Sequence, residues 1–293
     1  MQCPSLNFIV DNRPINRRTF LIALGSGIML YTAPTEALAK ASRFRINSHH
    51  EKYDDHIKDY LQKMHNFNKV NDEDIFLHAK KMPLLKSTVL RLLRIQAIVG
   101  HGRFHVLDFD DAIKCARNYS KIGSFSQKEL AFLEMIFYED SNAYGFLGDK
   151  VETKITSHIP IKHFIKIPRT GNYLYKGAPF ETYRKIRKEV GNQVILTSGI
   201  RSITKQFLLF LNKTYKCKGN LSMASRSLAP PGYSFHGISD FDVGQVGFGY
   251  SNFTIKFIRT NVYKRLKELG YLKLRYPKKN LMGVRFEPWH IKI

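Results

Sequence analysis

The hydrophobic pattern changes character near residue 150, and this change limits the folds open to the chain. Before it, residues 54–67, 86–100 and 109–122 carry apolar side chains at three- and four-residue spacing, the period of an amphipathic helix. After it, short β-like segments alternate with turns that contain Pro168 and Gly171. These strands are not regularly separated by helices, as a doubly wound parallel sheet would require. We therefore predict an α+β fold.

Local signals place the individual elements. Ser126 followed by Glu129 is typical of a capping box at the start of a helix over residues 128–140. The ranges predicted to be helical in the second half are 179–191, 203–215 and 260–270, and those predicted to be strands are 192–202 and 283–293. We place a helical region of unknown role at residues 40–150 and a second domain at residues 151–293.

The first 39 residues are predicted to be an export signal. Arg17 and Arg18 precede an apolar run of roughly 14 residues, and residues 37–39 read Ala-Leu-Ala, which suits signal peptidase. Such a run is too short to cross a ~30 Å hydrocarbon core comfortably as a helix. Because Arg-Arg-x-Phe-Leu resembles a twin-arginine signal, we expect a periplasmic protein with no stable transmembrane segment after signal removal. An uncleaved anchor and a buried N-terminal helix are the alternatives.

The chain is strongly basic, with 47 Lys and Arg residues against 24 Asp and Glu and a formal net charge of +23 at pH 7. Such an excess favours polyanionic partners: nucleic acid, an anionic membrane surface, or an acidic cell-wall polymer. The predicted export, together with a sequence that shows no recognisable nucleic-acid-binding motif, favours anionic cell-wall polymers and argues against nucleic acid. The alternative is a solvated basic surface without a partner.

The cysteines leave two alternatives open. Cys3 belongs to the predicted signal, whereas Cys115 and Cys217 remain and could form a disulfide in an oxidising periplasm. They show no C-x-x-C spacing, so a zinc–thiolate site is not expected. The other alternative is two separate buried thiols.

Four side chains in the last sixty residues have the chemistry of a metal site. His236, Asp242 and His290 offer two imidazoles and one carboxylate, a common ligand set of catalytic zinc that leaves a fourth position for water. Glu287 could take a proton from that water, as the glutamate of H-E-x-x-H does in helical zinc proteases. The sequence contains no H-E-x-x-H, so such a site would be assembled from loops and strand ends. Taken alone, each histidine is more often a hydrogen-bonded core or surface residue.

The spacing of these residues requires a bend on each side of the site. Six extended residues span about 20 Å, so His236 and Asp242 converge only if the chain turns between them. Gly237 permits such a turn. On a regular strand Glu287 and His290 would face opposite sides, but the proline between them disturbs the strand and could let both reach the same water.

A third stretch strengthens the metal interpretation. Residues 196–206 read LTSGIRSITKQ, residues 234–242 read SFHGISDFD, and residues 287–290 read EPWH. In this order they resemble S-G-x-R-S followed by Gln, S-x-H-x-x-G-x-A-x-D and E-x-W-H, the motifs of zinc D-alanyl-D-alanine carboxypeptidases of the VanY kind. The resemblance covers roughly residues 160–293 and does not explain the helical region before them.

The resemblance implies a role for each matching residue. His236, Asp242 and His290 would bind one zinc ion. Zinc would lower the pKa of its water, and Glu287 would take the proton as general base. Arg201 would stabilise the oxyanion or hold the substrate carboxylate.

One departure concerns the spacing of the two ligands in the middle motif. The family has six residues between its His and Asp, and this chain has five. Asp242 is followed by Val243 and Gly244, which fits the family's Asp-Val or Asp-Ile context better than Asp240 does. We therefore prefer Asp242 as the ligand and keep Asp240 as the alternative.

The candidates for substrate contacts are Ser234, Ser198, Gln206 and Trp289. Ser234 could instead cap a turn, and Gln206 could instead support the fold. The resemblance implies a small, mainly antiparallel-sheet zinc peptidase domain that hydrolyses D-alanyl-D-alanine-type bonds in peptidoglycan stem peptides. A peptidoglycan endopeptidase is the alternative within the enzyme class, and a non-catalytic zinc-containing cell-wall-binding protein is the alternative outside it.

Overall fold

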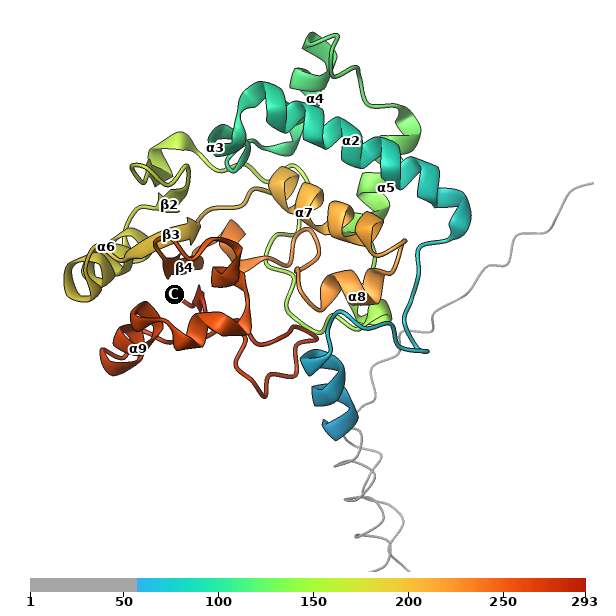
Figure 1. Cartoon of the computed structure of the whole chain (residues 1–293). Coiled ribbons are helices and arrows are strands. Elements are labelled where there is room, and N and C mark those ends of the chain that lie inside the picture. Colours follow the sequence, from blue (N-terminus) through green and yellow to red (C-terminus); the bar gives the residue numbers. More distant parts are fainter. Residues whose placement is uncertain (1–56) are drawn as a thin grey trace, which may run out of the picture. The chain divides into compact units, whose positions relative to one another are not determined.

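The computed structural model describes residues 57–293 (Figure 1). The predicted export signal, residues 1–39, lies outside this range. Residues Asp55–Ile293 form one compact unit. Among the described residues, no helix combines the length and the apolar character needed to span a membrane.

Helices dominate the chain up to residue 150. Residues 57–65 are helical. The elements that follow are η1 (Ala79–Lys81), α2 (Met82–Val99), α3 (His101–Phe104), α4 (Phe109–Asn118), α5 (Gln127–Tyr138) and η2 (Ser141–Tyr144). The helices predicted over residues 86–100, 109–122 and 128–140 are therefore confirmed, with ends that shift by a few residues.

Side-chain caps explain where these helices begin. Ser126 Oγ accepts a hydrogen bond from Glu129 N at 3.2 Å, and Glu129 Oε2 accepts one from Ser126 N at 2.8 Å, so the predicted capping box is confirmed. Asp108 caps α4 by accepting from Asp111 N at 2.8 Å. Each cap satisfies a backbone N–H that has no partner inside its helix and stabilises the helix by about 1 kcal/mol.

The second half mixes helices with two small antiparallel sheets. Its helices are η3 (Ile161–His163), α6 (Ala178–Val190), α7 (Ile203–Lys216), α8 (Leu221–Ser225), η4 (Phe235–Gly237), η5 (Gly249–Phe253), η6 (Ile255–Arg259) and α9 (Asn261–Glu268). Its strands are β1 (Phe164–Lys166), β2 (Tyr173–Tyr175), β3 (Val194–Ser198), β4 (Phe241–Gln245) and β5 (His290–Ile291). This mixture confirms the α+β fold class.

The strand predicted over residues 283–293, interrupted at Pro288, is wrong before the proline and confirmed only after it. Only β5, residues His290–Ile291, is a strand. Pro288 has no backbone N–H to donate to a neighbouring strand, so regular pairing begins only after it. This short strand is nevertheless the element that carries one of the candidate metal ligands.

The larger sheet has the strand order β3-β4-β5, and both pairings are antiparallel. The smaller sheet pairs β1 with β2. Helices α6 and α9 contact each other and pack against the larger sheet (Figure 1). Leu196 on β3, Val243 on β4 and Trp289 belong to the hydrophobic core that this packing buries.

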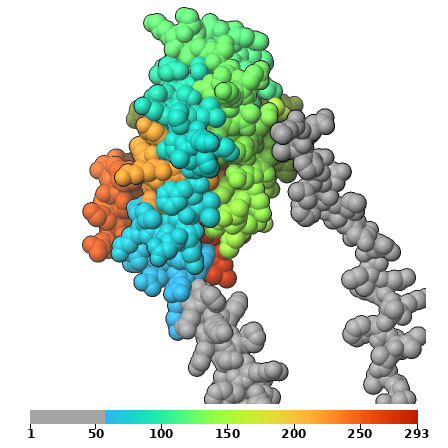
Figure 2. Space-filling view, turned by 90° about the vertical axis from the view of Figure 1, so that its right-hand side faces the viewer, coloured from blue at the N-terminus to red at the C-terminus, as the bar shows by residue number. Residues whose placement is uncertain are grey.

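A second hydrophobic core joins the helical region to α7. Leu92 on α2, Phe137 on α5 and Phe207 on α7 are all buried in it. Figure 2 shows a face formed largely by the segments coloured cyan to green, which are the helices of this region. The helical region therefore packs on the same helix, α7, that follows the S-G-x-R-S motif.

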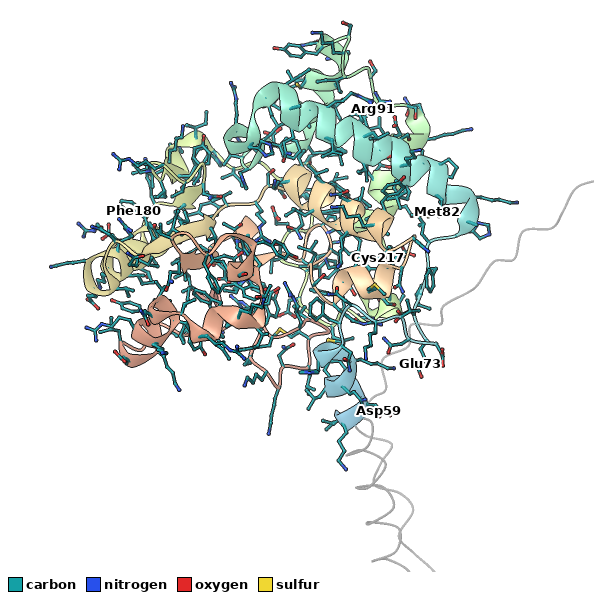
Figure 3. The ribbon with its side chains drawn as sticks, viewed as in Figure 1. Asp59, Glu73, Met82, Arg91, Phe180 and Cys217 are labelled. Atoms are coloured by element: carbon teal, nitrogen blue, oxygen red, sulfur yellow. The ribbon has the colours of Figure 1, made fainter. Side chains whose placement is uncertain are left out.

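Both cysteines in the described part of the chain, Cys115 and Cys217, are free thiols. Cys217 lies at the end of α7 (Figure 3). The disulfide alternative is therefore wrong.

Candidate metal centre

The register of the larger sheet brings the candidate ligands together. Asp242 on β4 is the pairing partner of His290 on β5 and of Ser198 on β3. The 3-10 turn η4 carries His236 and bends the chain before β4. Residues far apart in the sequence thus meet at one end of a three-stranded sheet.

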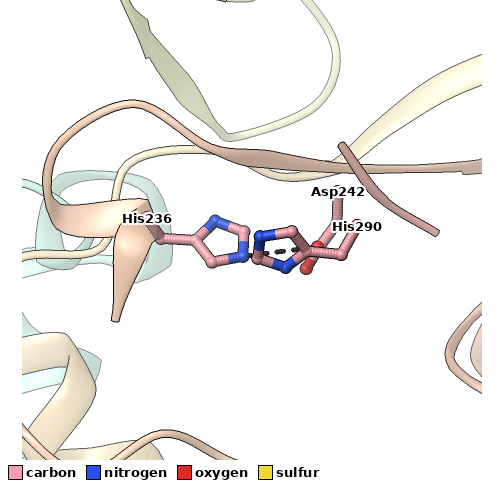
Figure 4. A group of neighbouring side chains, drawn as sticks. All are labelled: His236, Asp242 and His290. Atoms are coloured by element: carbon pink, nitrogen blue, oxygen red, sulfur yellow. Dashed lines mark ion pairs between the residues drawn. The ribbon is translucent and has the colours of Figure 1, made fainter. Parts of the chain in front are cut away.

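His236, Asp242 and His290 form a group whose ligand atoms all lie within 4.8 Å of one another, and all three side chains are buried (Figure 4). Asp242 Oδ1 lies 3.3 Å from His236 Nε2 and 3.3 Å from His290 Nδ1. The two imidazole rings are 4.8 Å apart between centroids and stand at 82° to each other. Among the described residues this is the only group of three or more His, Cys, Asp or Glu side chains with such geometry.

Each histidine is oriented by a hydrogen bond from its other ring nitrogen. His236 Nδ1 lies 2.8 Å from the carbonyl oxygen of Gly199, so this nitrogen must carry the proton. His290 Nε2 lies 3.0 Å from Asp240 Oδ2, so it must also carry a proton. The lone pairs of His236 Nε2 and His290 Nδ1 are thereby directed toward Asp242, as in metal sites whose ligands are oriented by outer hydrogen bonds.

Asp240 is not a member of the ligand group but supports it. It accepts two hydrogen bonds from Arg275, at 2.8 and 3.1 Å, besides the one from His290. Asp240 and Asp242 are two residues apart at the start of β4, so their side chains lie on one face. His290 is held between the two carboxylates. Asp242 is therefore the ligand candidate that the geometry supports over Asp240.

The electrostatic environment differs between the two histidines. Burial and the charge of Arg201 lower the pKa of His236 to about 4, so its imidazole is neutral at pH 7. Burial alone would also lower the pKa of His290, but its hydrogen bond to Asp240 and the neighbouring carboxylate of Asp242 raise it to about 9. A proton on His290 and a metal ion therefore compete for the same nitrogen.

Unpaired atoms show that this group suits a cation. His236 Nε2 and Asp242 Oδ1 are buried, and neither has a hydrogen-bond partner among the described residues. Two acceptors thus face each other with no donor between them, which costs free energy in a dry interior. A divalent cation bound by two imidazoles and one carboxylate would satisfy all three ligand atoms, and this donor set fits zinc.

Glu287 lies beside the ligand group. Its Oε2 is 3.6 Å from His290 Nδ1, and its Oε1 is 3.9 Å from Arg285 Nε. Burial raises the pKa of Glu287, although the charges of Arg285 and His290 oppose this effect. A buried carboxylate with a raised pKa near the ligands can accept a proton from a reacting water and release it again.

Arg201 faces the same carboxylate from the other side. Its Nη2 donates to Asp242 Oδ2 at 2.7 Å, and its Nε donates to Ser198 Oγ at 2.8 Å. Burial would raise the pKa of Asp242, but the charges of His236 and Arg201 hold it well below its ordinary value. Arg201 thus keeps Asp242 ionised, and its Nη1 has no hydrogen-bond partner among the described residues.

The four candidates for substrate contacts lie in different surroundings. Ser198 orients Arg201. Ser234 is buried, and its carbonyl oxygen accepts from Gly237 N at 2.9 Å in the turn η4. Gln206 on α7 is buried and donates to the carbonyl oxygen of Ala229.

Trp289 is also buried. Its ring packs edge-on against Phe253 with the centroids 6.1 Å apart and lies under the guanidinium of Arg285. The side chain belongs to the core beneath the sheet, while the carbonyl oxygen of Trp289 accepts from Val243 N at 3.0 Å. The contribution that this geometry supports is to hold the segment that carries Glu287 and His290.

Sequence reasoning missed two contributions to the site. It treated Asp240 only as a rival ligand, although the Asp-x-Asp spacing at the start of a strand could have placed both carboxylates on one face. It also assigned no contact to the helical region. His105, just after α3, accepts from Ser202 N through its carbonyl oxygen at 2.8 Å and so anchors the loop of Arg201. No sequence signal points to this contact.

Comparisons with known proteins agree with the motifs. Residues 178–293 match the family model of VanY, D-alanyl-D-alanine carboxypeptidase. No curated protein matches the chain in sequence.

Several solved structures resemble part of the chain. The LdcB LD-carboxypeptidase, solved for its peptidoglycan recognition, is 23% identical with a TM-score of 0.36, and the match covers 54% of this chain and 70% of that one. A mutant of the vancomycin resistance D,D-pentapeptidase VanY in complex with Zn(II) is 25% identical with a TM-score of 0.35, covering 45% and 80%. VanYB in complex with D-alanine-D-alanine is 23% identical with a TM-score of 0.38, covering 50% and 82%.

The family match confirms the resemblance over its part of the chain, and the enzyme class expected from the motifs, a D-alanyl-D-alanine carboxypeptidase-like metallopeptidase, is that of the matching family. The match to the VanY D-alanyl-D-alanine carboxypeptidase family model spans residues 178–293, the part of the chain that holds all the candidate ligands together with Glu287 and Arg201.

Proposed function

We propose that this protein is a zinc-dependent peptidase that hydrolyses D-alanyl-D-alanine-type bonds in peptidoglycan stem peptides. The observation that carries the proposal is the convergence of His236 Nε2, Asp242 Oδ1 and His290 Nδ1 within 4.8 Å, with His236 Nε2 and Asp242 Oδ1 buried and without a hydrogen-bond partner among the described residues. One zinc ion held by these atoms, when bound, would polarise the substrate carbonyl and lower the pKa of a water. The family match over residues 178–293 supports the same chemistry.

Glu287 moves the proton in this proposal. It takes a proton from the attacking water and passes it to the leaving amine, which requires a pKa above that of an ordinary exposed carboxylate. Its position 3.6 Å from a ligand nitrogen and its raised pKa support this role. Arg201, fixed by Ser198 and Asp242, donates through Nη1 to the carbonyl oxygen where charge develops or to the terminal carboxylate of the peptide.

The test is mass spectrometry of purified peptidoglycan fragments incubated with the zinc-loaded protein. Loss of a single terminal D-alanine, abolished by a chelator and restored by zinc, is the expected result. Cleavage within the stem or a cross-link would instead identify an endopeptidase. Zinc and cell-wall binding without any cleavage would identify a non-catalytic wall-binding protein and end the proposal.

The site of action follows from the substrate and the sequence. Peptidoglycan lies outside the cytoplasm, and residues 1–39 carry the features of a twin-arginine signal. We place the protein in the periplasm, held near anionic cell-wall polymers by its large excess of Lys and Arg over Asp and Glu. Fusing residues 1–39 to a reporter that is active only after export tests the route, and replacing Arg17 and Arg18 with lysine should abolish the reporter signal.

A further inference from the structure

A pocket of about 340 Å³ opens beside the turn that carries His236. Gly237, the residue that follows this ligand, forms part of its wall together with Glu152, Tyr175 and Ile238. A neighbouring pocket of about 540 Å³ shares Tyr175 and Ile238 with it. The depression therefore lies against the turn that follows His236, although none of the candidate ligands lines it, and one of its walls comes from the segment before α6, which lies outside the family match.

Glu152 is the unusual residue of this pocket. Its side chain is buried, yet it has no hydrogen bond and no ion pair with any described residue. Only its backbone is fixed, by a hydrogen bond from Glu152 N to the carbonyl oxygen of Gly232 at 2.9 Å. Burial raises the pKa of this carboxyl to about 7. The carboxyl lines the pocket without a protein partner, so an incoming donor can reach it, and a raised pKa in a pocket is typical of a group that binds a ligand.

The backbone around Glu152 is shaped to leave its carboxyl free. A Cβ on Gly237 would overlap Glu152 Oε2, so glycine at this position makes room for the carboxyl. The hydroxyl of Tyr175 donates to the carbonyl oxygen of Gly237 and is thus not available to Glu152. The carboxyl oxygens therefore have space beside them but no donor.

The charge in the pocket favours a cation as the ligand. Glu152 is the only acidic residue among those that line it. The basic residues at the rim, Lys154, His158 and His163, are exposed, and His158 pairs with Asp108 at 2.6 Å. Exposed charges are screened by solvent more strongly than a buried one. Among the described residues, Glu152 belongs to no group of three or more His, Cys, Asp or Glu side chains that could hold a metal ion. The cation that suits this single carboxylate is an ammonium group, which has three donors and a full charge.

We propose that Glu152 forms a subsite that binds a free primary ammonium group of the peptide substrate. This inference rests on the proposed function, because it assigns a substrate group to a pocket beside the candidate metal centre. Productive substrates would then carry an unblocked amine within reach of the pocket, and Glu152 would determine specificity without taking part in the chemistry.

The test compares three peptides that end in D-Ala-D-Ala. One has an acetylated N-terminus followed by lysine, one a free N-terminus followed by norleucine, and one an acetylated N-terminus followed by norleucine, so that only the third lacks an ammonium group. Binding is measured by calorimetry to zinc-loaded protein with Glu287→Gln, which prevents turnover. At least one ammonium-bearing peptide should bind ~10- to 100-fold more tightly than the third, the effect of one hydrogen bond to a charged group.

The variant Glu152→Gln should remove this difference, while the rim variant Lys154→Gln should keep it. Equal binding of all three peptides, or a difference that survives in Glu152→Gln, contradicts the subsite. Should Glu152→Gln fail to fold, Glu152→Asp, which withdraws the carboxylate by one methylene, replaces it and should weaken the preference, and equal binding of the three peptides by the protein with Glu152 intact still contradicts the subsite. Turnover of the same peptides by the wild-type protein tests the proposed function separately, because equal cleavage of all three supports the peptidase and rejects the subsite.

Discussion

Glu129 in the helical region and Asp242 in the C-terminal domain are both buried carboxylates that face an arginine. They differ in how many of their oxygen atoms have a hydrogen-bond partner. Both oxygens of Glu129 accept from Arg91 Nε, at 3.1 and 3.3 Å, and one also accepts from Ser126 N. Asp242 has one oxygen on Arg201, while the other has no hydrogen-bond partner among the described residues.

The difference separates a structural carboxylate from one kept for an external group. Burial would raise the pKa of Glu129, but its hydrogen bonds from Ser126 and Arg91 hold it below the ordinary value, so it stays charged and paired. Asp242 is charged as well, with an oxygen aimed at two imidazoles. Glu152 also has no protein partner for its oxygens, but it lines a pocket rather than a dry interior. Glu129 therefore has protein partners for both oxygens, whereas Asp242 and Glu152 keep oxygens that no described residue pairs with.

The largest effect that would sharpen this comparison is on catalysis. The change Glu287→Gln should lower kcat by ~10²- to 10⁴-fold, the usual contribution of a general base or acid. Zinc content and the melting temperature should not fall, because the change removes a buried charge and leaves the three ligands intact. Hydrolysis of a D-Ala-D-Ala peptide and metal analysis measure both. Turnover near that of the wild type would rule out Glu287 as the base.

A change in the helical region should lower stability and leave turnover unchanged, the opposite of Glu287→Gln. In Glu129→Gln, Arg91 loses its charged partner but keeps hydrogen bonds to the carbonyl oxygens of Ile122 and Gly123. We expect the free energy of unfolding to fall by about 2–3 kcal/mol, less than for a fully buried pair, because Arg91 is partly exposed. Turnover per folded molecule should be unchanged.

Urea unfolding followed by circular dichroism measures this loss. The matched control is Lys114→Ala, which breaks the exposed pair with Asp111 on α4 and should leave stability unchanged within error. A Glu129→Gln protein as stable as the wild type would show that the buried pair is not structural.

The next effect concerns Asp240, which shares features with both kinds of carboxylate. Asp240 is fully paired, like Glu129, but one of its partners is a candidate ligand, His290. Asp240→Asn should weaken zinc binding by ~10- to 100-fold, as loss of an outer carboxylate on a metal-bound imidazole does. Competition with a chromophoric chelator measures the affinity. Asp110→Asn, in the exposed first turn of α4, is the control, and equal affinities in both variants would remove Asp240 from the site.

The sequence predicted local elements and the separate ligands better than it predicted their supports. The capping box at Ser126 and the pairing of His236 with Asp242 depend on residues close in the chain, whose periodicity and turns can be read directly. The break at Pro288 could be predicted, but the short length of β5 could not, because it depends on pairing with β4. The role of Glu152 could not be predicted either, since it depends on a contact with Gly237 formed only in the folded chain.

The smallest effect tests whether Glu152 is indeed an unpaired buried carboxylate. Its pKa is raised from the ordinary 4.5 to about 7, so between these values the folded protein holds a proton that the unfolded chain releases. The stability that protonation of Glu152 contributes is present below pH 4.5 and is lost as the pH rises through 7.

Glu152→Gln should therefore be more stable than the wild type at pH 8 and equal to it at pH 4. The upper bound of the gain is about 3 kcal/mol, from 1.36 kcal/mol per pKa unit. Because the side chain can relax toward the pocket opening, we expect about 1–2 kcal/mol. Urea unfolding of both proteins at the two pH values measures the difference. A stability loss at pH 8 would mean that Glu152 has a partner in the folded protein, and the contrast with Glu129 would then disappear.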